Sequence, residues 1–223
     1  VDADGNSIYT ADMTDEQKYE AALQASISFF KAAGYTFDEA TGKFTAAPEG
    51  AEMTYEVIIP GGGTGDHPAF GILTAAKEAL ATIGITLQIN DPSDSSVWNN
   101  ALEANTAEMW AGAWGATVDP DMYQVYHSDN ANGKGTNSNH YSIEDADLDE
   151  MIIAARNSAD QSYRKATYKE CLETILDWGV EIPTYQRQNA VVISTERVNV
   201  STMTPDITTF WGWTNDIEKL EMN

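Results

Sequence analysis

Residues 108–128 read Glu-Met-Trp-Ala-Gly-Ala-Trp-Gly-Ala-Thr-Val-Asp-Pro-Asp-Met-Tyr-Gln-Val-Tyr-His-Ser, and this stretch decides how the chain folds. Its residues 109–113 are small and flanked by aromatic residues, which predicts a buried strand. Trp114 follows where that strand ends. Asp119 and Pro120 then predict the start of a helix, with Asp119 as N-cap and Pro120 at the first helical position. Open α/β sheets bind ligands where a strand runs into a helix N-terminus.

The residues before this stretch alternate between strand and helix patterns. Strands are predicted over residues 53–59 and 85–89, and helices over 66–83 and 93–105. Together with the strand at 109–113, they form a β-α-β-α-β unit. Such a unit predicts a parallel sheet with right-handed crossovers, so the fold class is α/β.

Further elements are predicted on both sides of this unit. A helix begins after Thr14, because Gln17 completes a capping box, and residues 37–44 form a hairpin. Towards the C-terminus we expect a Gly/Asn-rich loop at 129–139, helices at 144–157 and 160–178, and strands at 181–185 and 190–194. Residues expected to face inward are Val97 and Leu102 in the helix at 93–105, and Tyr168, Cys171, Leu172, Ile175 and Leu176 in the helix at 160–178.

Composition excludes several classes of function. The 223 residues carry a net charge of −23, which disfavours nucleic acid as a partner. Hydrophobic residues make up 42%, enough for a folded core, yet no apolar run reaches the length of a membrane span. The single cysteine, Cys171, has no internal disulfide partner and is expected to be buried and unreactive.

Motifs of known reactions are missing. No Gly-x-Ser-x-Gly or Gly-x-x-x-x-Gly-Lys occurs, and the glycine run at residues 61–65 has no following lysine, so a loop is favoured over a phosphate site. His67, His127 and His140 are dispersed, which argues against a metal site. We therefore expect neither a cofactor nor catalysis, although a glycosidase-type enzyme with acidic residues in a Trp-lined cleft is an alternative.

The order of several motifs resembles extracellular solute-binding proteins of the oligopeptide, dipeptide and nickel type, which feed ABC transporters. The first is the Trp-Gly-Ala-x-x-Asp-Pro-Asp segment that begins at Trp114. The others are Ala-Gly-Tyr at the end of a helix, Tyr followed by Asp-x-Leu-Asp, a long Tyr-containing helix, and the Ile-Pro segment after it. These motifs span residues 22–35, 139–152, 160–176 and 181–185, and the resemblance covers roughly residues 17–213.

The resemblance implies a periplasmic-binding-protein type II fold of two lobes that close on a solute. It places residues 1–200 in the second, C-terminal lobe. It also implies that residues 201–223 form a tail that packs towards the first lobe. No counterpart of that first lobe is found in this sequence, and the chain begins at Val1 rather than Met. We therefore expect a lobe fragment that carries half a binding site.

The resemblance also implies capture of oligopeptides outside the cell and delivery to a membrane permease of the ABC type. The location would be the periplasm, or the extracellular face of the membrane through a lipid anchor. Partners would be a peptide or other small solute, the permease and the first lobe. The ligand-binding residues would be Ala113, Trp114, Gly115, Thr117, Asp119, Tyr185 and Arg187, with the backbone near Trp114 pairing with a peptide main chain.

The sequence departs from the family's motif at one position, which leaves the class of solute undecided. Peptide-binding members often carry an aspartate shortly after this tryptophan, where it pairs with the ammonium of the peptide, and that position here is Thr117. Asp119 could substitute, and Arg187 could pair with a ligand carboxylate. Non-peptide solutes such as a nickel complex or an oligosaccharide are the alternative. A surface interaction domain that uses the aromatic residues at 210–213 is another.

Overall fold

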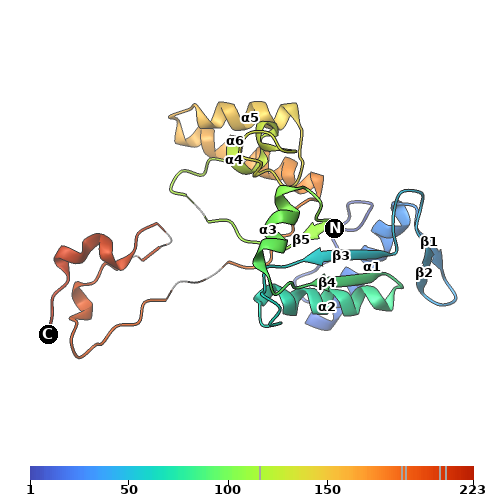
Figure 1. The fold of residues 1–223 in the computed structure, drawn as a ribbon, viewed down its shortest axis with the longest axis horizontal. Helices are drawn as coiled ribbons and strands as arrows, with labels where there is room; N and C mark the ends of the chain where they lie inside the picture. Colours follow the sequence, from blue (N-terminus) through green and yellow to red (C-terminus); the bar gives the residue numbers. More distant parts are fainter. Residues whose placement is uncertain (116, 187, 189, 206, 209) are drawn as a thin grey trace. The chain divides into compact units, whose positions relative to one another are not determined.

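The computed structural model describes residues 1–223 except 116, 187, 189, 206 and 209. The chain divides into two compact units, Val1–Ala113 and Trp114–Asn223. Figure 1 shows the elements of each unit. The expected division into a lobe at 1–200 and a tail at 201–223 stays a prediction.

The first unit is built on a small parallel sheet. Its strands follow the order β4-β3-β5, and both pairings are parallel. Val57 of β3 lies opposite Ile89 of β4 and Met109 of β5. The elements are α1 (Asp15–Ala32), β1 (Thr36–Asp38), β2 (Lys43–Ala46), β3 (Thr54–Ile58), α2 (Pro68–Thr82), β4 (Thr86–Asn90), α3 (Ser95–Glu103) and β5 (Met109–Trp110). The expected α/β class and the β-α-β-α-β order are therefore confirmed.

Local sequence explains how these elements begin and end. The side chains of Thr14 and Gln17 form the predicted capping box at α1. β1 and β2 form the predicted hairpin. One core cluster packs α2 against the sheet, and a second packs α1 against the hairpin of β1 and β2. Figure 1 shows where these helices and strands lie.

Two expectations for the first unit were wrong. The strand predicted over residues 109–113 ends at Trp110, and Met109 is exposed rather than buried, because β5 pairs with β3 over only two residues. In α3, Leu102 is buried as expected, but Val97 is 44% exposed. The spacing of apolar residues correctly predicted a helix here, but it did not predict which of its apolar side chains are buried.

The second unit is mainly helical. Its elements are α4 (Tyr123–Tyr126), η1 (Ser128–Asn130), α5 (Ala146–Arg156), α6 (Gln161–Trp178), η2 (Val200–Thr202) and η3 (Trp213–Lys219). α5 and α6 pack against each other around a core that includes Leu148, Ile152 and Cys171. Burial raises the pKa of the Cys171 thiol, as expected for an unreactive buried cysteine.

Three expectations for the second unit were also wrong. Leu172 and Leu176 of α6 are exposed, since the core is formed by Tyr168, Cys171 and Ile175. The described residues of 181–185 and 190–194 form no strand. The helix expected after Asp119 begins only at Tyr123. None of the helices in the described part of the chain is long and apolar enough to cross a membrane.

Candidate functional site: an aromatic cluster beside a carboxylate

Four rings of the second unit form what we call the aromatic cluster: Trp114, Tyr126, His140 and Tyr141. The Trp114 and His140 rings stack, with centroids 6.3 Å apart and an interplanar angle of 14°. Tyr126 and Tyr141 stack at 5.6 Å and 7°. The Trp114 indole Nε1 donates to the Tyr141 hydroxyl at 3.4 Å, and the Tyr126 hydroxyl donates to the Glu181 Oε2 at 2.6 Å. A hydrogen-bonded and stacked path therefore leads from Trp114 to Glu181.

The two tyrosines of the cluster stay protonated well above neutral pH. Burial raises the pKa of Tyr141 to about 12. The pKa of Tyr126 is raised too, first by burial and then by its hydrogen bond to Glu181. Both phenols are therefore neutral hydrogen-bond donors under physiological conditions. Trp114 remains 45% exposed, so part of its ring is available to a ligand.

A buried asparagine holds the turn that presents His140 and Tyr141. Asn139 is fully buried; its side chain donates to the backbone oxygens of His127 and Ile143 and accepts from the Ile143 N–H. Its own N–H donates to the oxygen of Asn130. This network satisfies the polar groups of a segment that the sequence predicted only as a Gly/Asn-rich loop.

The Asp-Pro-Asp motif anchors the segment after Trp114 to the helical pair. Asp119 forms an ion pair with the buried Arg164 of α6 at 2.6 Å, and Asp121 forms one with Arg156 of α5 at 3.3 Å. Asp121 also accepts from the Tyr123 N–H. Asp119 is therefore not a helix N-cap, contrary to expectation, because its carboxylate turns to the guanidinium of Arg164.

The other predicted binding residues lie as follows. Gly115 and Thr117 are exposed, and the Thr117 hydroxyl donates to the backbone oxygen of Asp119. Tyr185 is half-exposed in an irregular segment. Ala113 is exposed at the end of the first unit, and Arg187 lies outside the described residues. Among the predicted residues, the structure links Trp114 to a defined cluster and links Thr117 and Asp119 to each other.

Sequence reasoning assigned no role to Tyr126, His140, Tyr141 or Glu181. His140, Tyr141 and Glu181 stand within the motifs that carry the family resemblance, which was the available signal. Glu181 was missed because its segment was predicted as a strand, whereas it follows the end of α6 without forming one.

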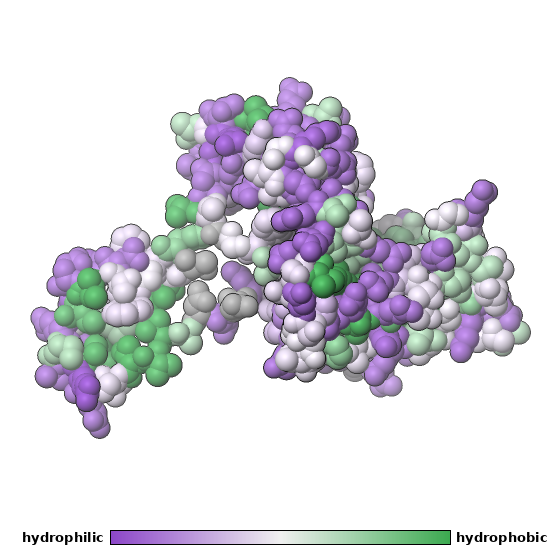
Figure 2. Space-filling model, in the orientation of Figure 1, coloured by the Kyte–Doolittle hydropathy of each residue, from purple (hydrophilic) through white to green (hydrophobic). Residues whose placement is uncertain are grey.

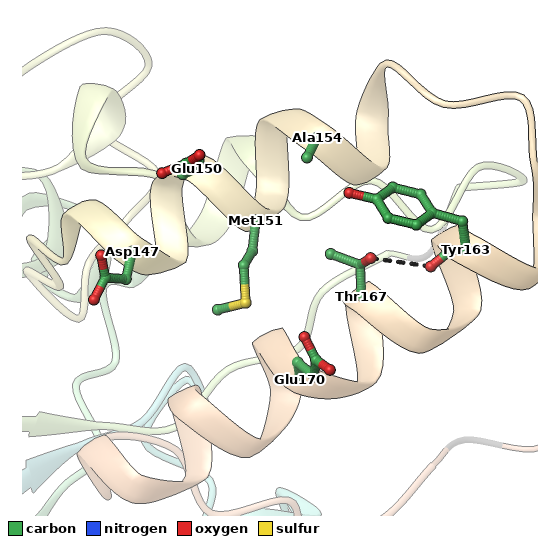
Figure 3. A pocket seen from close by; sticks show the side chains of 7 residues that line it. All are labelled: Asp147, Glu150, Met151, Ala154, Tyr163, Thr167 and Glu170. Atoms are coloured by element: carbon green, nitrogen blue, oxygen red, sulfur yellow. Dashed lines mark hydrogen bonds between the residues drawn. The ribbon is translucent and has the colours of Figure 1, made fainter.

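A shallow groove of about 340 Å³ lies elsewhere in the second unit, between α5 and α6 (Figure 3). Its lining residues are Asp147, Glu150, Met151, Ala154, Tyr163, Thr167 and Glu170. No residue of the aromatic cluster lines it.

The potential metal ligands and the glycine run at residues 61–65 can be compared with the predictions made for them. No group of three or more potential metal ligands occurs among these residues. In the glycine run, the Asp91 carboxylate accepts from the N–H groups of Gly63 and Gly65. These donors are thus already satisfied by a negative charge, which disfavours an anion there.

Comparison with known proteins places this geometry in context. No protein-family model and no curated protein matches the sequence. Among solved structures, the oligopeptide-binding protein AppA from Bacillus subtilis, in complex with a nonapeptide, has a TM-score of 0.55 and 15% identity; the match covers 78% of this chain and 33% of that chain. NikZ from Campylobacter jejuni, in complex with Ni(L-His), has a TM-score of 0.55 and 18% identity. That match covers 73% of this chain and 30% of that chain.

A third similar structure is a periplasmic oligopeptide-binding protein from Thermotoga maritima with mannohexaose bound. Its TM-score is 0.57 at 14% identity, and the match covers 74% of this chain and 30% of that chain. The chain therefore has part of the periplasmic-binding-protein fold, and the resemblance drawn from its motifs is confirmed at the level of the fold. It spans about a third of the length of these proteins, none of which is described as an enzyme.

Proposed function

We propose that the chain is the ligand-binding lobe of an ABC-transporter solute-binding protein that captures oligopeptides outside the cell. The observation that carries this proposal is the half-exposed Trp114, held by Tyr141 and His140 in a chain with this fold. An anchored indole offers a rigid apolar wall that tolerates many side chains. The exposed Gly115 beside it leaves the backbone open to a peptide main chain.

In this proposal the chain acts together with two further partners. A first lobe would cover the solute from the other side, and the closed form would dock on a membrane permease. The location would be the periplasm or, with a lipid anchor, the extracellular face of the membrane. The contributions of Tyr185, Arg187 and Ala113 to the site belong to this proposal.

One observation favours a second solute class. The Thr117 hydroxyl is engaged with the Asp119 backbone, and the Asp119 carboxylate is engaged with Arg164. Neither is therefore disposed to neutralise a peptide ammonium. A non-peptide solute, such as a nickel complex or an oligosaccharide, is the corresponding second candidate.

Indole resonances of the chain test the proposal. The ¹H–¹⁵N signal of Trp114 is followed while tetra-alanine, Ni(L-His) or mannohexaose is added. Trp178 is 47% exposed and donates to Asp145, so its indole serves as an internal control. We expect tetra-alanine to shift Trp114 in a saturable way and to leave Trp178 in place, whereas a shift with Ni(L-His) or mannohexaose alone would favour the second candidate. If no solute shifts Trp114, or if both indoles shift alike, the proposal is wrong.

A further inference from the structure

The carboxylate of Glu181 is partly buried and forms no ion pair with any cation among the residues that the structure describes. It accepts a hydrogen bond from the Tyr126 hydroxyl at 2.6 Å and also interacts with the Tyr141 hydroxyl. In these contacts it differs from Asp119 and Asp121 in the same unit, which each face an arginine. A carboxylate that is partly removed from water is stabilised by a nearby positive charge.

The rings around Glu181 favour the same kind of ligand. Tyr126 and Tyr141 are neutral donors, so they add no second negative charge to the site. Trp114 exposes nearly half of its surface, and the face of an indole attracts cations more strongly than the other aromatic rings do. One carboxylate oxygen and several ring faces therefore lie along one connected path.

We propose that Glu181 and the aromatic cluster bind the positively charged end of the solute, a primary ammonium or a guanidinium group. This inference rests on the proposed function and names the class of solute. Glu181 would supply the charge that Thr117 and Asp119 do not, and the rings would contact the carbon atoms next to the cation. Neutral and anionic solutes would then bind more weakly than cationic solutes of the same shape.

The test compares two peptides that differ only in charge. Trialanine amide carries one ammonium group, and N-acetyl-trialanine amide carries none. Each is titrated into the whole 223-residue chain while the indole signal of Trp114 is followed. We expect trialanine amide to bind at least tenfold more tightly. Equal binding of both peptides would overturn the cation site and leave the proposed function standing.

The variant Glu181→Gln removes the charge but keeps an acceptor for the Tyr126 hydroxyl. We expect it to lose at least tenfold in affinity for trialanine amide. Glu170→Gln is the matched control, because it removes one carboxylate from the groove between α5 and α6 and should stay within twofold of wild type. Unchanged affinity in Glu181→Gln would overturn the inference. The peptide pair tests it on wild type even if that variant does not fold.

The two proposals also fail in different ways. If neither peptide shifts Trp114, the ammonium site is wrong. The broader solute-binding role is then judged by Ni(L-His) and mannohexaose, which probe it independently of Glu181.

Discussion

Among single residues, Asp119 stabilises the fold through an ion pair rather than as the helix N-cap that was predicted. Its carboxylate pairs with Arg164, whose side chain is only 11% exposed. In Asp119→Asn this guanidinium would lose its counter-ion, so we expect a loss of about 1–2 kcal/mol of stability. The free energy of unfolding, measured by urea titration of wild type and Asp119→Asn, tests this expectation. Asp121→Asn is the control, since its partner Arg156 is 45% exposed, and we expect a loss of under about 1 kcal/mol. Equal losses would mean that burial of the arginine is unimportant.

Tyr141 makes stability depend on alkaline pH. Its pKa rises from the ordinary 10.0 to about 12 on folding, chiefly through burial. The folded chain thus holds this proton more tightly than the unfolded chain. The stabilisation is complete below pH 10 and is lost as the pH rises from about 10 to about 12. We expect the urea midpoint to fall over this window, and to fall less in Tyr141→Phe. An identical fall in both proteins would contradict the buried phenol.

The residues of the site could be predicted only in part. Trp114 was predicted as a binding residue, because it follows the end of a strand and begins the first motif of the family resemblance. The role of Asp119 was not, because aspartate suits both a helix N-cap and an ion pair with arginine. Which role it takes depends on where α4 begins, and α4 begins at Tyr123, which packs against the core of the second unit.

Among the secondary-structure elements, Gly84 illustrates a position fixed by backbone geometry. It lies between α2 and β4 with a φ of +87°, and an added Cβ would stand 2.7 Å from the Phe44 oxygen. We expect Gly84→Ala to lose about 2–3 kcal/mol. Gly71→Ala is the matched control, because Gly71 lies inside α2 with nothing within 4 Å of an added Cβ. That change should gain about 0.5–1 kcal/mol. Thermal unfolding of the two variants compares their stabilities. Similar stabilities of Gly84→Ala and Gly71→Ala would contradict the turn geometry at Gly84.

The helices and the parallel sheet were predictable because several signals agreed in each. α1 and α6 each have a capped N-terminus and apolar residues that pack on a core cluster, and β3 and β4 pair in parallel over five residues. The strands predicted at 181–185 and 190–194 had strand propensity alone. A strand forms only when a neighbour pairs with it, and propensity cannot supply that partner.

For the molecule as a whole, exposed apolar residues gather in the C-terminal segment, residues 195–223 (Figure 2). Phe210, Trp211 and Ile217 are exposed there, and the segment is closed by a bond from the Asn223 N–H to the Arg197 oxygen. If a first lobe normally covers this surface, the isolated chain should bind a hydrophobic dye or dimerise. We expect Phe210→Ser with Ile217→Ser to reduce dye fluorescence at least twofold.

The control for this prediction is Val192→Ser, which removes an apolar side chain that is 96% exposed outside the segment. It should leave the fluorescence within about a fifth of wild type, since Val192 lies outside the segment where the exposed apolar residues gather. A chain that stays monomeric at high concentration and binds no dye would argue against a missing first lobe.

The central claim is that Trp114 contacts a solute. Native mass spectrometry of the chain, purified without denaturation and mixed with tetra-alanine, Ni(L-His) and mannohexaose, tests it most directly. Trp114→Ala is compared with Trp178→Ala, since both indoles are about half-exposed. We predict that wild type and Trp178→Ala retain a solute mass and that Trp114→Ala does not. Equal retention by Trp114→Ala, or no retention by wild type, would contradict the account.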